Sequence, residues 1–185
     1  ELGTAISVIN SVAIERYIEI IDNLDYPDEI EAAQVPQFSD FCDGVYRVPE
    51  LLEFTPAGMT FEKLGYQLIK SSTEVAGVKY GENHSKLAST MELVEITKRP
   101  SNVISTALGK YLTKFMPDQK NELLKRLAIR QYMAQKMIHD SAEGILSYRD
   151  TVGCLSITTA VRRKNNVRVY LEFILKDTAF EKRLS

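Results

Sequence analysis

The sequence predicts a mainly helical fold built from tandem helix-turn-helix units with one small β-hairpin. Apolar residues recur at helical spacing along most of the chain, and Pro or Gly separates the helical stretches. Two short β-branched runs lie close together near the middle. With 44% apolar and 26% charged residues, the composition is typical of a globular protein and excludes a disordered one. We expect three parts: an acidic N-terminal segment (1–44), a first unit (45–116) and a second unit (117–185).

The N-terminal segment is expected to hold one helix and a loop. Residues 4–22 place apolar side chains at helical spacing, although the β-branched residues at the start also fit a strand. Residues 23–44 are acidic and are interrupted by Pro27 and Pro36, which indicates a loop with one short helix through 28–33.

The first unit alternates helices and turns. Three helices are expected in it, at 44–54, 61–70 and 80–91. Pro49 lies near the start of the first helix, and Thr60 caps the second. Two extended runs and a closing helix follow, at 93–96, 103–105 and 108–115. Three helices followed by a two-stranded ribbon with a basic tip (97–102) is the order of a winged helix. The alternative is a small helical subdomain with an incidental hairpin.

The second unit begins after Pro117. Three helices are expected in it, at 118–140, 147–152 and 157–176. Ser156 caps the last helix, and a polar tail follows it. A long helix, a short helix, a turn and a helix of recognition length again give the helix-turn-helix order, but no wing follows.

Charge is distributed unevenly along the chain. Residues 1–58 carry two basic and twelve acidic side chains, a net charge of −10, whereas residues 59–185 carry 21 basic and 13 acidic ones, a net charge of +8. Opposite halves of this kind indicate a positive surface for a polyanion with an acidic module beside it. A chance distribution of solvated charges is the alternative.

Several stretches of both units resemble winged-helix modules of prokaryotic restriction–modification and related defence or regulatory proteins. These stretches are MTFEKLG (59–65), VKYGENHSKLA (78–88), LV (93–94), TALG (106–109) and TTAVRRKNNVRVYL (158–171). The resemblance covers residues 45–175 and implies a DNA-recognition role in a larger restriction-type or regulatory protein, with any nuclease on a separate domain. The resemblance also implies an aromatic residue near Tyr170 and a wing after it. The sequence shows no such wing.

In the first unit the helix at 80–91 is expected to enter the major groove with its N-terminus first. Asn83 suits a bidentate contact with adenine, and Lys79 and Lys86 suit phosphate or guanine. The alternative for Asn83 is a capping or turn role. His84 is interpreted as a half-buried packing residue, because no second His or carboxylate cluster shares its spacing.

Two further basic places complete the predicted DNA-binding site. Lys98 and Arg99 at the hairpin tip fit phosphate or minor-groove contacts, with a solvated tip as the alternative. The densest basic run lies on the last helix and consists of Arg162, Arg163, Lys164, Asn165, Asn166 and Arg168. Guanidinium and amide groups that alternate on one helical face are suited to direct readout of DNA bases. The alternative for this run is a solvated face without a ligand.

Enzymatic functions are disfavoured, so we expect no catalytic residue, no cofactor and no metal. The sequence has no P-loop, GxGxxG, GxSxG or HExxH motif and no Cys/His zinc set. The acidic residues at 22–31 do not form a nuclease motif, because no Lys follows at the required spacing and Pro27 breaks the segment. Cys42 and Cys154 lie far apart, which fits a reduced compartment.

The sequence also bears on location and partners. No apolar run approaches the roughly 18 residues of a membrane span, and no basic, apolar leader opens the chain. The chain does not begin with Met, so we expect it to be part of a longer polypeptide. We therefore expect a cytoplasmic, nucleoid-associated protein that binds double-stranded DNA, with a homodimer or the domains of its parent protein as further partners. The competing class is a protein-interaction or dimerisation module on a winged-helix scaffold, in which the acidic segment binds a basic partner or masks the basic face.

Overall fold

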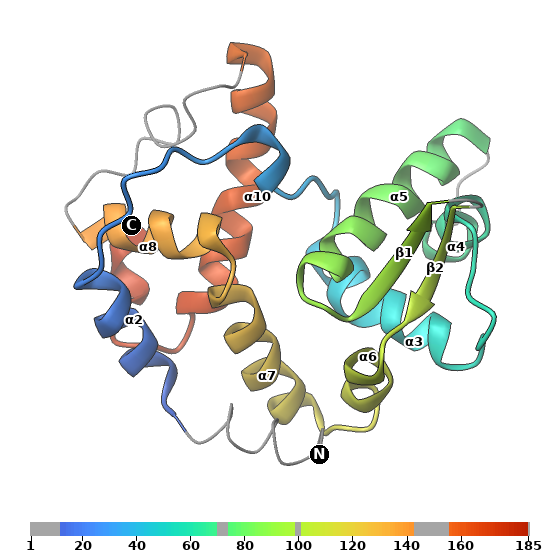
Figure 1. Ribbon diagram of the computed structural model, residues 1–185, viewed down its shortest axis with the longest axis horizontal. Coiled ribbons are helices and arrows are strands. Elements are labelled where there is room, and N and C mark those ends of the chain that lie inside the picture. The colour runs from blue at the N-terminus through green and yellow to red at the C-terminus, as the bar shows by residue number, and fades with distance from the viewer. Residues whose placement is uncertain (1–11, 70–73, 99–100, 143–155, 185) are drawn as a thin grey trace. The chain divides into compact units, whose positions relative to one another are not determined.

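The computed structural model of the chain describes residues 12–69, 74–98, 101–142 and 156–184 (Figure 1). It is mainly helical and contains one two-stranded antiparallel sheet, as the composition of elements predicted. The chain divides into two compact units: unit 1 comprises residues 3–36 and 125–185, and unit 2 comprises residues 37–124. These limits differ from the expected boundaries at 44 and 116, because the N-terminal segment packs with the C-terminal helices instead of standing alone.

Unit 2 begins with a helical stretch that contains a π-helical turn. This turn, η2 (Asp43–Arg47), runs directly into α3 (Val48–Glu53), which has Pro49 in its first turn as expected. Next, α4 (Phe61–Leu68) begins at Thr60, whose hydroxyl accepts a hydrogen bond from the Lys63 backbone N–H at 3.3 Å. The cap predicted from the sequence is therefore confirmed.

The third helix, α5 (Glu74–Thr90), is longer than expected. The sequence predicted that this helix begins only at residue 80. Helices α4 and α5 lie very close together. A Cβ on Gly65 of α4 would lie 1.8 Å from the carbonyl oxygen of Gly77, and a Cβ on Gly81 of α5 would lie 2.0 Å from the carbonyl oxygen of Phe61. The helical glycines therefore serve the crossing of α4 and α5, and they do not end a helix.

The predicted hairpin is confirmed. Strands β1 (Val94–Lys98) and β2 (Ser101–Ser105) pair antiparallel, from Val94 opposite Ser105 to Lys98 opposite Ser101. Met59, between α3 and α4, forms an isolated antiparallel β-bridge with Val103 of β2. Their backbones exchange hydrogen bonds of 2.8 and 2.9 Å. A continuous helix through this region is thereby excluded. Helix α6 (Ala107–Leu112) follows, with Thr106 as its cap.

The core of unit 2 lies between α5 and the hairpin. Its fully buried side chains come from η2, α3, α4, α5, the turn between α5 and β1, and β2, namely Val45, Val48, Leu52, Leu64, Leu87, Met91, Leu93 and Val103. Because α5 buries one face only, its opposite face remains available to solvent.

The single helix expected at 118–140 is two helices in the structure. Helix α7 (Pro117–Ile129) and helix α8 (Tyr132–Ala142) are separated at Arg130 and Gln131, and the boundary between the units falls within α7. Every residue from 123 to 129 is buried, so that end of α7 is surrounded by protein on all sides. A single straight amphipathic helix would bury only one stripe of its surface. The apolar pattern of the sequence did not show that the helix is interrupted after Ile129.

Unit 1 combines the N-terminal segment with the C-terminal helices. Its elements are α2 (Ile14–Asp22), a 3₁₀ turn η1 (Ala32–Gln34), part of α7, α8, α10 (Ile157–Leu175) and a 3₁₀ turn η3 (Glu181–Leu184). Ser156 caps α10 as expected, accepting from the Thr159 N–H. The core side chains include Ile18, Ile30, Ile138, Tyr170 and Ile174, all fully buried. The short helix expected at 147–152 lies outside the described residues.

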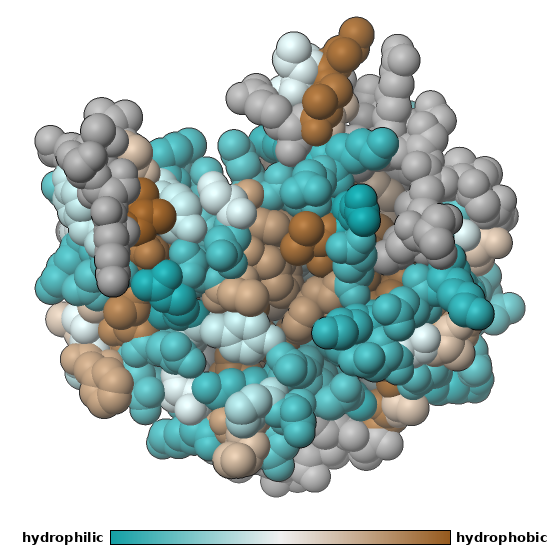
Figure 2. Space-filling model, turned by 180° about the vertical axis from the view of Figure 1, so that it is seen from behind, coloured by the Kyte–Doolittle hydropathy of each residue, from teal (hydrophilic) through white to brown (hydrophobic). Residues whose placement is uncertain are grey.

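None of the helices in the described ranges is long and apolar enough to cross a membrane. On the face drawn in Figure 2, hydrophilic side chains predominate.

Candidate nucleic-acid interface

The exposed face of α5 carries a polar stripe. Lys79, Glu82, Asn83 and Lys86 follow one another at spacings of three, one and three residues, which places them on one side of a helix. Both lysine side chains are 59% exposed. The opposite side is fully buried through His84, Leu87, Ala88 and Met91. The sequence-predicted residues of this helix are thus brought together on a surface that faces solvent.

Glu82 ties the two lysines of this stripe together. Its carboxylate accepts from Lys79 Nζ at 2.8 Å and from Lys86 Nζ at 2.5 Å. These hydrogen bonds lower the pKa of Glu82 below its usual range, against the opposing effect of its partial burial. Lys79 and Lys86 were expected to contact phosphate or guanine, and no role was assigned to Glu82, although the i, i+3 and i, i+4 spacings indicate such pairs.

Asn83 lies between the two lysines in the middle of α5. It is half-buried and is the tenth residue of the helix, so the alternative of a capping or turn role is wrong. In the part of the chain that the structure describes, its side chain makes no hydrogen bond. Its amide therefore retains a donor and an acceptor for a ligand. Because α5 begins at Glu74, these residues lie along the middle of the helix and not at its N-terminus.

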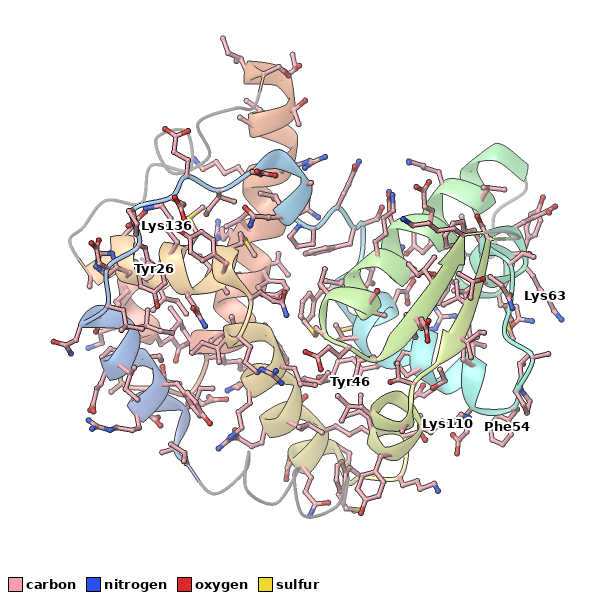
Figure 3. The ribbon with its side chains drawn as sticks, viewed as in Figure 1. Tyr26, Tyr46, Phe54, Lys63, Lys110 and Lys136 are labelled. Carbon is pink, nitrogen blue, oxygen red and sulfur yellow. The ribbon has the colours of Figure 1, made fainter. Side chains whose placement is uncertain are left out.

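The hairpin lies next to α5 and is tied to the turn before α4. Strand β1 packs on α5 and runs back beside it (Figure 1). The Asn102 side chain donates to the carbonyl of Ala57 at 2.7 Å, which joins the hairpin to the turn before α4. Lys98 is exposed at the end of β1, as expected, whereas Arg99 lies outside the described residues. Lys63 on α4 also points outward (Figure 3), and the sequence analysis did not single it out.

A buried polar network supports α5 from behind. The Tyr80 hydroxyl donates to Asp43 at 2.7 Å, and Arg47 donates to the other oxygen of that carboxylate at 2.7 Å. The ring of His84 stacks on Tyr80 with centroids 3.9 Å apart. This network joins the π-helical turn to α5. Burial of Tyr80 and its hydrogen bond to Asp43 raise the pKa of the Tyr80 hydroxyl.

Both ring nitrogens of His84 are used. Nε2 accepts from the backbone N–H of Asp40 at 3.2 Å, so Nδ1 carries the proton and donates to the Tyr80 carbonyl at 2.8 Å. Burial lowers the pKa of His84, outweighing Asp40 and Asp43 nearby. His84 is thus a packing residue that is fully buried (0% exposed), not half-buried as expected. Among the described residues no group of three or more His, Cys, Asp or Glu could hold a metal ion.

The basic run on α10 is divided by the fold of unit 1. Asn166 is buried with 8% exposed, because it shares the inward face with Tyr170 and Ile174. Arg163 is half-buried and donates to the Val35 carbonyl at 3.3 Å. The burial of Asn166 and the hydrogen bond of Arg163 within unit 1 therefore do not favour these two residues as contacts with a duplex.

The remaining members of this run face solvent where their side chains are described. Lys164 and Asn165 are exposed, and Arg168 pairs with Glu172 at 2.6 Å with both side chains largely exposed. The side chain of Arg162 lies outside the described part of the structure. The first turns of α10 also expose Ile157 (72%) and Val161 (70%), so this end of the helix is amphipathic and not purely basic.

The acidic N-terminal segment is bound to α8 and η3 of unit 1. The Arg183 guanidinium donates to both carboxylate oxygens of Asp22, at 2.6 and 2.8 Å, and Tyr132 of α8 donates to the Asp28 carbonyl at 2.8 Å. On α8, Lys136 donates to the Tyr26 carbonyl at 3.2 Å (Figure 3). Residues 14–36 of the acidic segment therefore pack within unit 1, against its C-terminal elements.

No family model, curated protein or solved structure matches this chain. The resemblance to winged-helix modules therefore stays a prediction.

Proposed function

We propose that this chain binds double-stranded DNA through unit 2, as the recognition part of a larger restriction-type or regulatory protein. In this proposal α5 is the recognition helix and the β1–β2 hairpin is the wing. The order α3, extended Met59, α4, α5, β1, β2 supports it, because a winged helix also has a short strand between its first two helices that pairs with the hairpin. The observation that carries the proposal is the uncovered polar stripe of α5 beside that hairpin.

Each residue of the stripe has a role in the proposed complex. The Asn83 amide is suited to a bidentate contact with an adenine edge, and Lys79 and Lys86 on either side of it are suited to phosphates. Glu82 limits both lysines, because their ammonium groups must leave its carboxylate to reach DNA. Lys98 on the hairpin supplies a third phosphate contact.

Charge predicts modest affinity with a shallow salt dependence. Residues 37–124 carry ten basic and eleven acidic side chains, so unit 2 has no general positive field. Three phosphate contacts give a slope of about 0.9 per contact, or roughly 2.7 log units of affinity per log unit of salt. On α10, Lys164 and Asn165 form a secondary candidate contact, since residues 156–171 contain four basic and no acidic side chains.

The test is fluorescence anisotropy with random duplex DNA at two salt concentrations. Lys79→Ala with Lys86→Ala should weaken binding about tenfold or more and lower the salt slope by roughly 1.8. The matched control, Lys110→Ala with Lys114→Ala, removes the same charge from an exposed part of unit 2 (Lys110 is labelled in Figure 3) and should change affinity less than twofold. Melting curves verify that both double variants fold.

Glu82→Gln gives a result of opposite sign. It removes the carboxylate that holds both lysines, so duplex binding should become several-fold tighter. Absence of duplex binding at low salt would refute the proposal and favour the protein-interaction class. Equal losses in the α5 variant and its control would show that net charge alone, and not this stripe, determines binding.

A further inference from the structure

The two polar residues at the centre of the α5 stripe differ in what they can exchange with a base. Asn83 carries an amide, which both donates and accepts hydrogen bonds, whereas the ionised carboxylate of Glu82 only accepts them. The hydrogen bonds from Lys79 and Lys86 lower the pKa of Glu82, so this side chain is a carboxylate at neutral pH. The stripe therefore presents an acceptor-only group next to a group of mixed character.

The lysine partners of Glu82 are weakly held. Lys79 and Lys86 are largely exposed and reach the carboxylate at spacings of three and four residues. Exposed ion pairs of this kind contribute little to stability. A duplex offers both ammonium groups a phosphate instead. That exchange leaves the Glu82 carboxylate in the major groove without its two cations.

The major groove offers few hydrogen-bond donors to such a carboxylate. Guanine presents two acceptors there, thymine an acceptor and a methyl group, and adenine a donor beside an acceptor. Cytosine presents only a donor, its N4 amine. A carboxylate that faces acceptors where water is excluded stays unpaired, and an unpaired charge is costly. The Glu82 carboxylate is therefore compatible with cytosine and discriminates against the other bases.

Glu82 and Asn83 are placed to contact neighbouring base pairs. Consecutive Cα atoms lie about 3.8 Å apart, close to the spacing of about 3.4 Å between successive bases of one strand. Both residues are half-buried, so their backbones belong to the packed part of the helix while their polar ends face solvent. A base contacted by Glu82 would thus lie next to the adenine assigned to Asn83.

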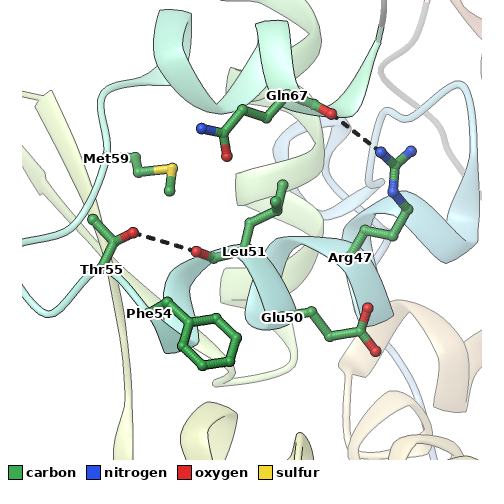
Figure 4. Close-up of a pocket in the computed structure, with 7 residues that line it drawn as sticks. All are labelled: Arg47, Glu50, Leu51, Phe54, Thr55, Met59 and Gln67. Carbon is green, nitrogen blue, oxygen red and sulfur yellow. Dashed lines mark hydrogen bonds between the residues drawn. The ribbon is translucent and has the colours of Figure 1, made fainter.

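Base readout also requires that α5 be held rigidly. Behind this helix, the Tyr80 hydroxyl and Arg47 both donate to the Asp43 carboxylate. Arg47 also lines the pocket in Figure 4, where it donates to the Gln67 carbonyl at 3.1 Å and ties the end of α4 to the same network. Tyr80 lies two residues before Glu82, so α5 is anchored at the point where it presents this carboxylate.

We infer that Glu82 is a specificity-determining residue of the proposed DNA-binding site and selects a C·G pair beside the A·T pair that Asn83 contacts. The inference rests on the proposed function of unit 2. The carboxylate lowers the affinity for every duplex, because it competes with phosphates for the two lysines. It lowers that affinity least where the N4 amine of a cytosine replaces them. Glu82 therefore exchanges affinity for sequence discrimination.

The experiment is selection from a randomised duplex library with the full chain, followed by binding isotherms on the selected duplex. The wild-type chain should enrich a C·G pair next to an A·T pair, and replacing that C·G pair with T·A should weaken binding about tenfold. Glu82→Ala should abolish the preference for cytosine and keep the preference for adenine. Glu82→Gln should shift the preferred base from cytosine to adenine, because an amide pairs with N6 and N7 of adenine.

Glu62→Ala is the matched control, because it removes the same charge from an exposed position on α4 and should keep the preference for cytosine. Melting curves verify that all variants fold. If both Glu82 variants gain affinity equally for all sequences, Glu82 acts through its charge alone and the inference is overturned. Duplex binding without a cytosine preference also overturns it, and in both cases the proposed function stands. Absence of duplex binding by the wild-type chain refutes the proposed function and this inference together.

Discussion

Gly81→Ala is expected to destabilise the protein, although alanine is the better helix former. In a solvent-exposed helix this substitution stabilises by about 0.5–1 kcal/mol. At position 81 the added Cβ would lie 2.0 Å from the Phe61 carbonyl oxygen and 2.8 Å from the Gly65 nitrogen. Both atoms belong to the backbone of α4, so no side-chain rotation relieves the clash and the helices must separate. Overpacking of a well-packed contact costs about 1–3 kcal/mol, and we expect a net loss of about 1–2 kcal/mol after the gain in propensity.

Gly77→Ala is the matched control in the same helix. Its Cβ would meet only the ring of Tyr66, at 3.3 Å, and that ring is 40% exposed and able to move. This variant should be neutral or slightly stabilised. Urea denaturation followed by circular dichroism measures the free energy of unfolding, and hydrogen exchange assigns the loss to α4 and α5. If the Gly81→Ala variant is as stable as the Gly77→Ala variant, the inference that α4 and α5 are in tight backbone contact at Gly81 is refuted.

Two further predictions concern local features of unit 2. Burial lowers the pKa of His84 in the folded protein, despite the nearby Asp40 and Asp43. The unfolded chain therefore binds a proton at this residue more readily than the folded one. The stability that this residue contributes is present above its unfolded pKa of roughly 6.5 and is lost as the pH falls. The free energy of unfolding should therefore decline from about pH 7 to about pH 5, and His84→Gln should flatten that slope; an unchanged slope contradicts the prediction. Thr60→Ala removes the cap that accepts from the Lys63 N–H and should cost about 1 kcal/mol in urea denaturation, whereas an unchanged midpoint would show that water replaces the cap.

Local signals in the sequence predicted the elements that depend on neighbouring residues. Thr60 and Ser156 are N-caps in the structure because an N-cap needs only a hydroxyl and the N–H three residues later. The hairpin was found because β-branched residues flank a turn, and its pairing of Lys98 with Ser101 leaves two residues in that turn. Pro49 was placed in the first turn of its helix for the same local reason.

Features that depend on distant contacts were missed. Gly77 signals a turn when read alone, yet it lies inside α5; Gly81 in the same helix is explained only by its close approach to the backbone of α4. Asn166 reads as part of a polar run, yet the helical phase set by Tyr170 turns it inward. The pairing of Lys79 and Lys86 with Glu82 was available from spacing, but the basic residues were weighed without the acidic residue between them. Sequence periodicity identifies a face only after the position of the neighbouring element is known.

Folding brings the acidic N-terminal and the basic C-terminal segments of the sequence into the same unit. Residues 1–36 carry eight acidic and one basic side chain, and residues 125–185 carry twelve basic and six acidic ones, yet both segments belong to unit 1. Their opposite charges therefore offset each other within one compact unit, as the paired Asp22 and Arg183 illustrate. Neither unit then provides the broad positive field that attracts nucleic acid without specificity. Any affinity for DNA must come from a few well-placed groups, and for that reason the ion pairs that hold Lys79 and Lys86 on Glu82 are expected to limit the proposed interface most.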